Sequence, residues 1–127
     1  MKFSVEFREP IATLSVHVEK LDARHAPELK AEFVSLANDG KFNMVLDLTE
    51  ARYCDSSGLS AVLVGNRLCR DNGGSFVICG LQPSVEKLIQ ISQLDRVLTI
   101  TPTASEAFDL IVMEETERSL GADTSDS

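Results

Sequence analysis

The spacing of apolar residues predicts how the chain begins. Apolar and polar residues alternate over residues 3–7 and again over residues 14–18, and Pro10 lies between the two runs. A period of two is typical of a strand with one buried face. Because the break between the runs is short, we expect these two strands to form a hairpin.

Beyond the hairpin the pattern indicates helices and strands, which alternate from residue 42 onward. Apolar residues at helical spacing predict helices over residues 27–37, 57–70, 83–89 and from about residue 104. Continuous apolar runs predict strands over residues 44–48, 75–79 and 97–100. Such alternation implies right-handed parallel crossovers. The expected fold is α/β, a four- to five-stranded mixed sheet with about four helices packed on it.

The length of the chain fits one small domain, since 127 residues are enough for a single core. We place this domain at residues 1–118. Residues 119–127 are small and polar, and they offer almost nothing to bury. We therefore expect them to form a disordered tail.

Composition argues against several kinds of partner. The net charge is −8, from 20 acidic and 12 basic residues, and the sequence shows no dense Lys/Arg cluster for direct nucleic-acid binding. The sequence contains no apolar run of the length that crosses a bilayer. Residues 1–6 lack the pattern of a signal peptide. We expect a cytoplasmic protein that acts on neither membrane nor nucleic acid directly.

The segment Tyr-Cys-Asp-Ser-Ser-Gly-Leu at residues 53–59 is the most informative one, because it joins a buried strand to a helix. The first turn of a helix has free backbone N–H groups and a partly positive end. A serine there can cap the helix, help to bind an anion, or carry a phosphate. Taken alone, the string favours a simple N-cap.

The sequence contains little that indicates a catalytic or metal-binding site. The spacings of Cys54, Cys69 and Cys79 fit no metal site, and an odd number argues against a disulfide framework. A nearby helix start could lower the pKa of Cys54, but Asp55 would oppose that. The elbow motif of serine hydrolases lacks its first glycine, and both histidines come early in the chain. We predict no catalytic residue, metal or cofactor, and a protein that is not an enzyme.

The order of elements around Asp-Ser-Ser-Gly-Leu resembles the STAS family, and specifically the anti-sigma factor antagonists of bacterial partner-switching systems. The resemblance covers roughly residues 3–115. It implies the STAS fold, and it implies that the serine after the aspartate, Ser56, is phosphorylated. Asp55, Ser57 and Gly58 would then shape the turn, and Leu59 would offer contact area to a partner.

The resemblance also implies partners. One is an anti-sigma factor that is itself a Ser/Thr kinase and binds the ATP. The other is a PP2C-type phosphatase that removes the phosphate. The family has a Gly-Glu-Leu-Asp segment where this chain has Glu-Lys-Leu-Asp at residues 19–22. Leu21 and Asp22 match, so Asp22 is a candidate partner-binding residue, but the loop around it is expected to sit differently.

Two alternatives leave Ser56 unmodified. The chain would then be a fixed STAS subunit of a lipid-transport ABC assembly, or a scaffold component of a stress-sensing complex. If Ser56 is the switch, a small neutral contact becomes a bulky anion on phosphorylation. Gly58 would let partners approach the serine. Helix propensity alone predicts that Gly58→Val changes stability by only a few tenths of a kcal/mol.

Overall fold

The computed structural model describes the backbone of residues 1–125 and the side chains of residues 1–120. The elements follow one another as β1 (Phe3–Arg8), β2 (Ile11–Val16), β3 (Lys20–Leu21), α1 (Ala26–Asn38), β4 (Met44–Asp47), β5 (Tyr53–Cys54), α2 (Ser56–Asp71), β6 (Phe76–Cys79), α3 (Pro83–Ile91), the 3-10 helix η1 (Leu94–Arg96), β7 (Thr99–Thr101) and α4 (Ala104–Ser125).

The main sheet has five strands in the order β1-β2-β4-β6-β7. Strands β1 and β2 form the antiparallel hairpin, and the remaining neighbours pair in parallel. Together with α1 to α4 in the described chain, this confirms the predicted α/β class, the mixed sheet and the number of helices.

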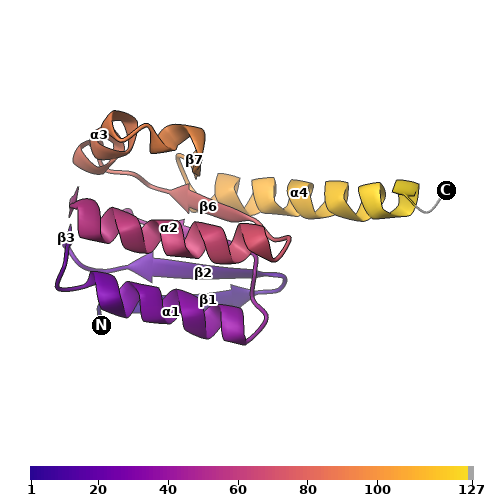
Figure 1. The fold of residues 1–127 in the computed structure, drawn as a ribbon, viewed down its shortest axis with the longest axis horizontal. Coiled ribbons are helices and arrows are strands. Elements are labelled where there is room, and N and C mark those ends of the chain that lie inside the picture. The colour runs from indigo at the N-terminus through magenta and orange to yellow at the C-terminus, as the bar shows by residue number, and fades with distance from the viewer. Residues whose placement is uncertain (126–127) are drawn as a thin grey trace.

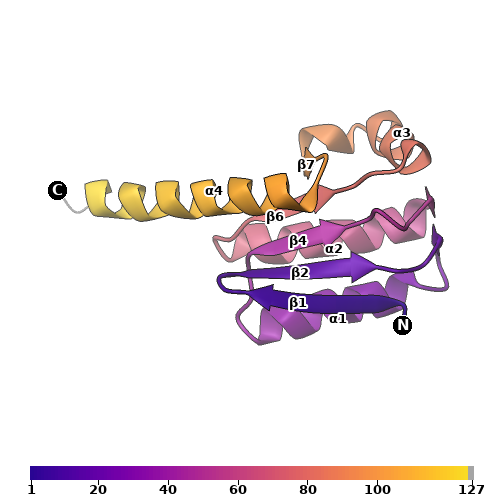
Figure 2. The same cartoon turned by 180° about the vertical axis from the view of Figure 1, so that it is seen from behind.

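Helices cover both faces of the sheet, as the two views show (Figures 1 and 2). On one face, Phe33 of α1 and Val62 of α2 pack in the larger core with Leu46 of β4. On the other face, Ile111 of α4 packs with Val45 of the same strand. Strand β4 is therefore buried on both sides, which explains its continuous apolar sequence.

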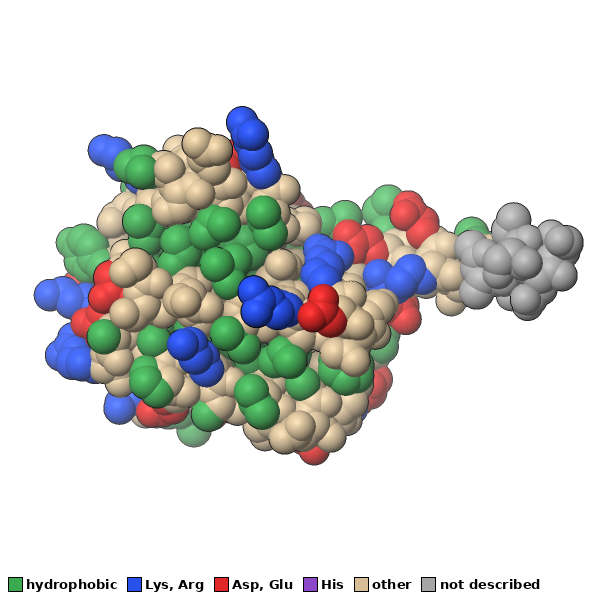
Figure 3. Space-filling view, in the orientation of Figure 1, with side chains coloured by type: hydrophobic (Ala, Val, Ile, Leu, Met, Phe, Trp, Pro, Cys, Tyr) green, Lys and Arg blue, Asp and Glu red, His purple; other side chains and the backbone are tan. Residues whose placement is uncertain are grey.

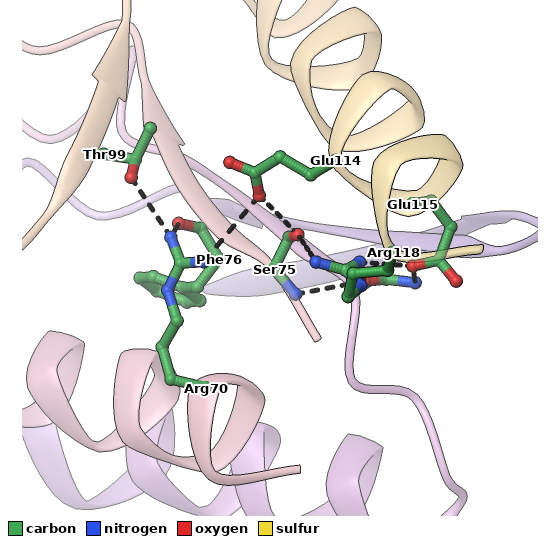
Figure 4. A network of polar contacts seen from close by, with 8 residues as sticks. Arg70, Ser75, Phe76, Thr99, Glu114, Glu115 and Arg118 are labelled. Atoms are coloured by element: carbon green, nitrogen blue, oxygen red, sulfur yellow. Dashed lines mark hydrogen bonds and ion pairs between the residues drawn. The ribbon is translucent and has the colours of Figure 1, made fainter. Parts of the chain in front are cut away.

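A polar network ties α4 to the sheet (Figure 4). The buried Ser75 hydroxyl lies 2.5 Å from Glu114 Oε1, to which it donates, and it accepts a hydrogen bond from Arg118 at 3.0 Å. Arg70, near the end of α2, lies 3.7 Å from Glu114 and donates to Thr99 Oγ1 at 3.1 Å. The network fixes the side on which α4 lies, which is opposite α1 and α2.

Helix α4 differs from the sequence prediction in its length. It continues to Ser125 and projects past the ends of the strands, so residues 119–125 are helical backbone where a disordered tail was predicted (Figure 1). A helix satisfies its hydrogen bonds along its own axis, so burying little surface does not by itself end it. Residues 126–127 of the predicted tail lie outside the described residues. Nowhere in residues 1–125 is a helix both long and apolar enough to span a bilayer.

Candidate functional site

The predicted motif lies where α2 begins, and Asp55 caps that helix. Asp55 has an extended backbone, with φ −105° and ψ −175°, and its Oδ1 accepts the Gly58 N–H at 2.9 Å. This is ordinary N-cap geometry. Ser56, the first helical residue, is exposed, and its hydroxyl bonds to no described residue. The capping role that the string alone suggested for a serine therefore belongs to Asp55.

A small second sheet holds the segment before α2 in place. Strands β3 and β5 pair in parallel, with Lys20 opposite Tyr53 and Leu21 opposite Cys54. The Tyr53 N–H donates to the carbonyl of Glu19 at 3.0 Å. The segment around Asp22 was treated as a loop in the sequence analysis, so this pairing was missed. It gives the serine a fixed backbone support.

Gly58 allows α2 to start directly against β3. A Cβ at this position would lie 2.1 Å from the Leu21 carbonyl oxygen and 2.9 Å from Cys54 Sγ. The expectation that Gly58→Val is nearly neutral for stability is therefore wrong. Helix propensity does not include a collision between two pieces of backbone. Gly58 itself is buried, so it supports the site from beneath.

Leu59 does not offer the contact area expected of it. Its side chain is 6% exposed and belongs to the main core. The apolar side chain that does face solvent here is Tyr53, which is 48% exposed. Tyr53 lines two shallow hollows, one shared with Asp22 and Asp55 and the other with Arg52 and residues 82–84. Tyr53 is the better candidate for an apolar contact beside Ser56.

Asp22 lies at the same end of the molecule and already has a partner. Its carboxylate accepts hydrogen bonds from Arg24 Nη2 at 2.9 Å and from Arg24 Nε at 3.2 Å. The hydrogen bonds from Arg24 hold the pKa of Asp22 below its ordinary value, even though partial desolvation acts in the opposite direction. The structure thus brings Asp22 near the motif, and it pairs the carboxylate with a neighbouring guanidinium.

The thiol of Cys54 is protonated at neutral pH. Burial, and secondarily the charge of Asp55, raise its pKa to about 12. The start of α2 does not overcome these two effects, so the structure gives no basis for a reactive thiolate at Cys54. Burial likewise raises the pKa of Cys69 and of Cys79 to about 12. Among residues 1–120, no group of acidic, histidine or cysteine side chains could hold a metal ion.

Beside Ser56 lies a hollow between the first turns of α1 and α2. Its volume is about 480 Å³, and it is lined by Ala23, Ala26, Pro27, Lys30, Ser56, Ser57 and Ser60. Lys30 is the one charged residue in this lining. Sequence reasoning missed Lys30, since only the packing of α1 against α2 brings it to the motif. Figure 3 shows Lys and Arg side chains along the end of the molecule where both helices begin.

Comparison with known proteins identifies the class. The family model described as "Mlab, STAS domain" matches residues 7–101. The chain therefore belongs to the STAS domain family, as the motif suggested.

Individual relatives add detail. BtrV of Bordetella bronchiseptica, named as a candidate anti-sigma factor antagonist, is 33% identical over 85 residues, covering 67% of this chain and 71% of BtrV. The crystal structure of a candidate antagonist from Thermotoga maritima superposes with a TM-score of 0.77 at 23% identity, covering 86% of this chain and 93% of that one. The Bacillus cell fate determinant SpoIIAA, in its phosphorylated form, gives a TM-score of 0.67 at 21% identity, covering 86% and 98%. The two structures support the fold.

Proposed function

We propose that this protein is an anti-sigma factor antagonist that switches partners by phosphorylation of Ser56. Unphosphorylated, it binds an anti-sigma factor kinase in the cytoplasm, and phosphorylation releases it. One observation carries the proposal. The Ser56 hydroxyl is exposed on a rigid helix start and has no structural task, because Asp55 caps the helix.

Two related proteins support the proposal. BtrV is named as a candidate anti-sigma factor antagonist, and SpoIIAA has been solved in a phosphorylated form. By analogy, the partner is a Ser/Thr kinase that brings its own ATP, and a PP2C-type phosphatase restores the unmodified serine. The chain itself then needs no cofactor.

The contact surface follows from what is exposed around the serine. Tyr53 and Ser57 provide the apolar and polar contacts, while Gly58 and Leu59 support the helix start from within. The Asp22–Arg24 pair lies where the partner would extend from Tyr53. An exposed aromatic side chain beside shallow hollows is a typical anchor in protein interfaces.

Phosphorylation of Ser56 changes the binding free energy enough to release a partner. Phosphorylation adds about −1.5 to −2 charges at Ser56. The start of α2 stabilises that anion by about 0.3–1 kcal/mol in the free protein. Burying the same dianion unpaired in an interface costs several kcal/mol. Turning a complex from nearly all bound to nearly all free takes roughly 5.5 kcal/mol, which the interface term can supply while the fold stays unchanged.

The test compares two aspartate variants in binding to the anti-sigma factor kinase by calorimetry. Ser56→Asp should stay folded, since an acidic residue suits a helix N-terminus, and should lose most of its affinity. Ser105→Asp is the matched control, because it places the same charge in the first turn of α4 on the opposite side of the sheet. Equal affinity for Ser56→Asp and wild type would refute the switch.

A second candidate function is considered because the description of the matching family model includes the name Mlab. In it the chain is a fixed STAS subunit of a lipid-transport ABC assembly, or a scaffold component of a stress-sensing complex, and Ser56 is never modified. This candidate predicts that Ser56→Asp leaves assembly unchanged. It also predicts that Ser56 carries no phosphate in protein purified from the native host.

A further inference from the structure

The hollow beside Ser56 is formed by two helix faces. Ala26 and Pro27 precede Lys30 by four and three residues in α1, so both lie beside Lys30 on the helix surface that lines the hollow. Ser56 and Ser60 are one turn apart on α2 and line the opposite wall. A group attached to the Ser56 hydroxyl therefore has this hollow beside it, with Lys30 at its border.

Lys30 is the one charged side chain in the lining of the hollow. Arg24 is committed to Asp22, and His25 lies against the Lys20 carbonyl at 3.0 Å and 3.6 Å from Asp22. Lys30 is exposed and forms no ion pair with any described residue. Asp55 directly precedes Ser56, and its carboxylate, which caps α2, would repel a neighbouring phosphate.

We propose that Lys30 is the counter-ion of the phosphate on Ser56. Its flexible four-carbon stem can carry the ammonium group across the hollow, as lysine stems commonly do. The ammonium group offsets the repulsion from Asp55 and stabilises the dianion over the monoanion. Because an exposed ion pair of this kind is weak, most of the cost of burying the dianion in a partner interface remains, and the switch keeps its effect. This inference rests on the proposed function, since it names how the same site is regulated.

The second ionisation of the phosphate reports this contact directly. A phosphoserine has a second pKa of about 6. We would install phosphoserine at position 56 by genetic encoding and follow its ³¹P chemical shift with pH. In Lys30→Gln the second pKa should rise by about 0.2 to 0.7 of a pH unit, the size expected for an exposed ion pair. In 1 M salt the difference should shrink, because the Debye length falls to about 3 Å.

Two further variants separate a specific contact from net charge and from folding. Lys30→Arg keeps the cation and should titrate like wild type. Lys87→Gln removes one exposed cation from α3, outside the hollow, and should also titrate like wild type. Coincident curves for wild type and Lys30→Gln would overturn the proposal, as would an equal shift in Lys87→Gln.

The phosphate in this experiment is installed without a kinase. Failure of the Lys30 contact therefore leaves the proposed switch standing. Failure of the switch would show itself separately, as an unphosphorylated Ser56 in the native host.

Discussion

Replacing Gly58 by alanine adds a single methyl group where α2 meets β3. That methyl carbon would lie 2.1 Å from the Leu21 carbonyl oxygen, whereas real Cβ contacts shorter than 3.0 Å are essentially never seen. The two backbone segments must therefore separate by about 1 Å. A side chain cannot absorb this by changing rotamer, because the obstructing atom belongs to the backbone of the β3–β5 sheet.

Two opposing contributions determine how much stability Gly58→Ala loses. Overpacking of a buried site lowers the free energy of unfolding by about 1–3 kcal/mol, and we expect the upper end of this range at Gly58 because the obstructing atom is backbone. The higher helix propensity of alanine over glycine raises the free energy of unfolding by about 1 kcal/mol. The net loss is about 2 kcal/mol. With an unfolding entropy of about 2.1 cal/mol/K per residue over 127 residues, Tm should fall by about 7 °C.

Thermal unfolding followed by circular dichroism measures this loss. Ser60→Ala is the matched control, since it changes an exposed position in the same helix and should stay within about 2 °C of wild type. A Tm for Gly58→Ala equal to or above that of wild type would show that helix propensity decides the outcome. The close approach of α2 to β3 would then not exist in solution.

Three further predictions concern other parts of the account. Tyr53→Ala should leave Tm nearly unchanged and weaken binding to the kinase measured by calorimetry, because Tyr53 is 48% exposed beside Ser56; unchanged affinity would remove Tyr53 from the interface. Arg118 holds the pKa of Glu115 below its ordinary value of 4.5, so the stability that this pair contributes is present above that pH and is lost as pH falls through the lowered pKa. The Tm difference between wild type and Arg118→Met should accordingly be largest near pH 7 and shrink on acidification, and a difference that grows below pH 4.5 would contradict this. Because burial raises the pKa of Cys54 to about 12, a disulfide reagent at pH 8 should modify it slowly in the native protein and rapidly after denaturation, and rapid native modification would contradict its protonated state.

The sequence predicted the elements whose hydrophobic pattern extends over several residues. The apolar run of β4 indicated a strand buried on both faces, and the alternation in β1 and β2 indicated a hairpin, because each signal extends over several residues. A strand of two residues has no period, so β3 and β5 could not be recognised.

The site was predicted less completely, for a physical reason. The motif located Ser56 and Asp55, since a cap and the first turn it precedes are neighbours in the sequence. The tight contact at Gly58 depends on a carbonyl far away in the sequence, and so does the place of Lys30. Leu59 is apolar, and apolar character alone does not distinguish a core residue from a contact residue. The burial of Leu59 in the structure shows that it is a core residue.

Phosphopeptide mapping of the protein purified from its native host tests the central claim most directly. Intact mass and fragment spectra should show one phosphoryl group on Ser56 in a fraction of the molecules, and none on a Ser56→Ala variant expressed in the same host. Phosphate on Ser57 with Ser56 bare, or no phosphate under any growth condition that activates the system, would contradict the account.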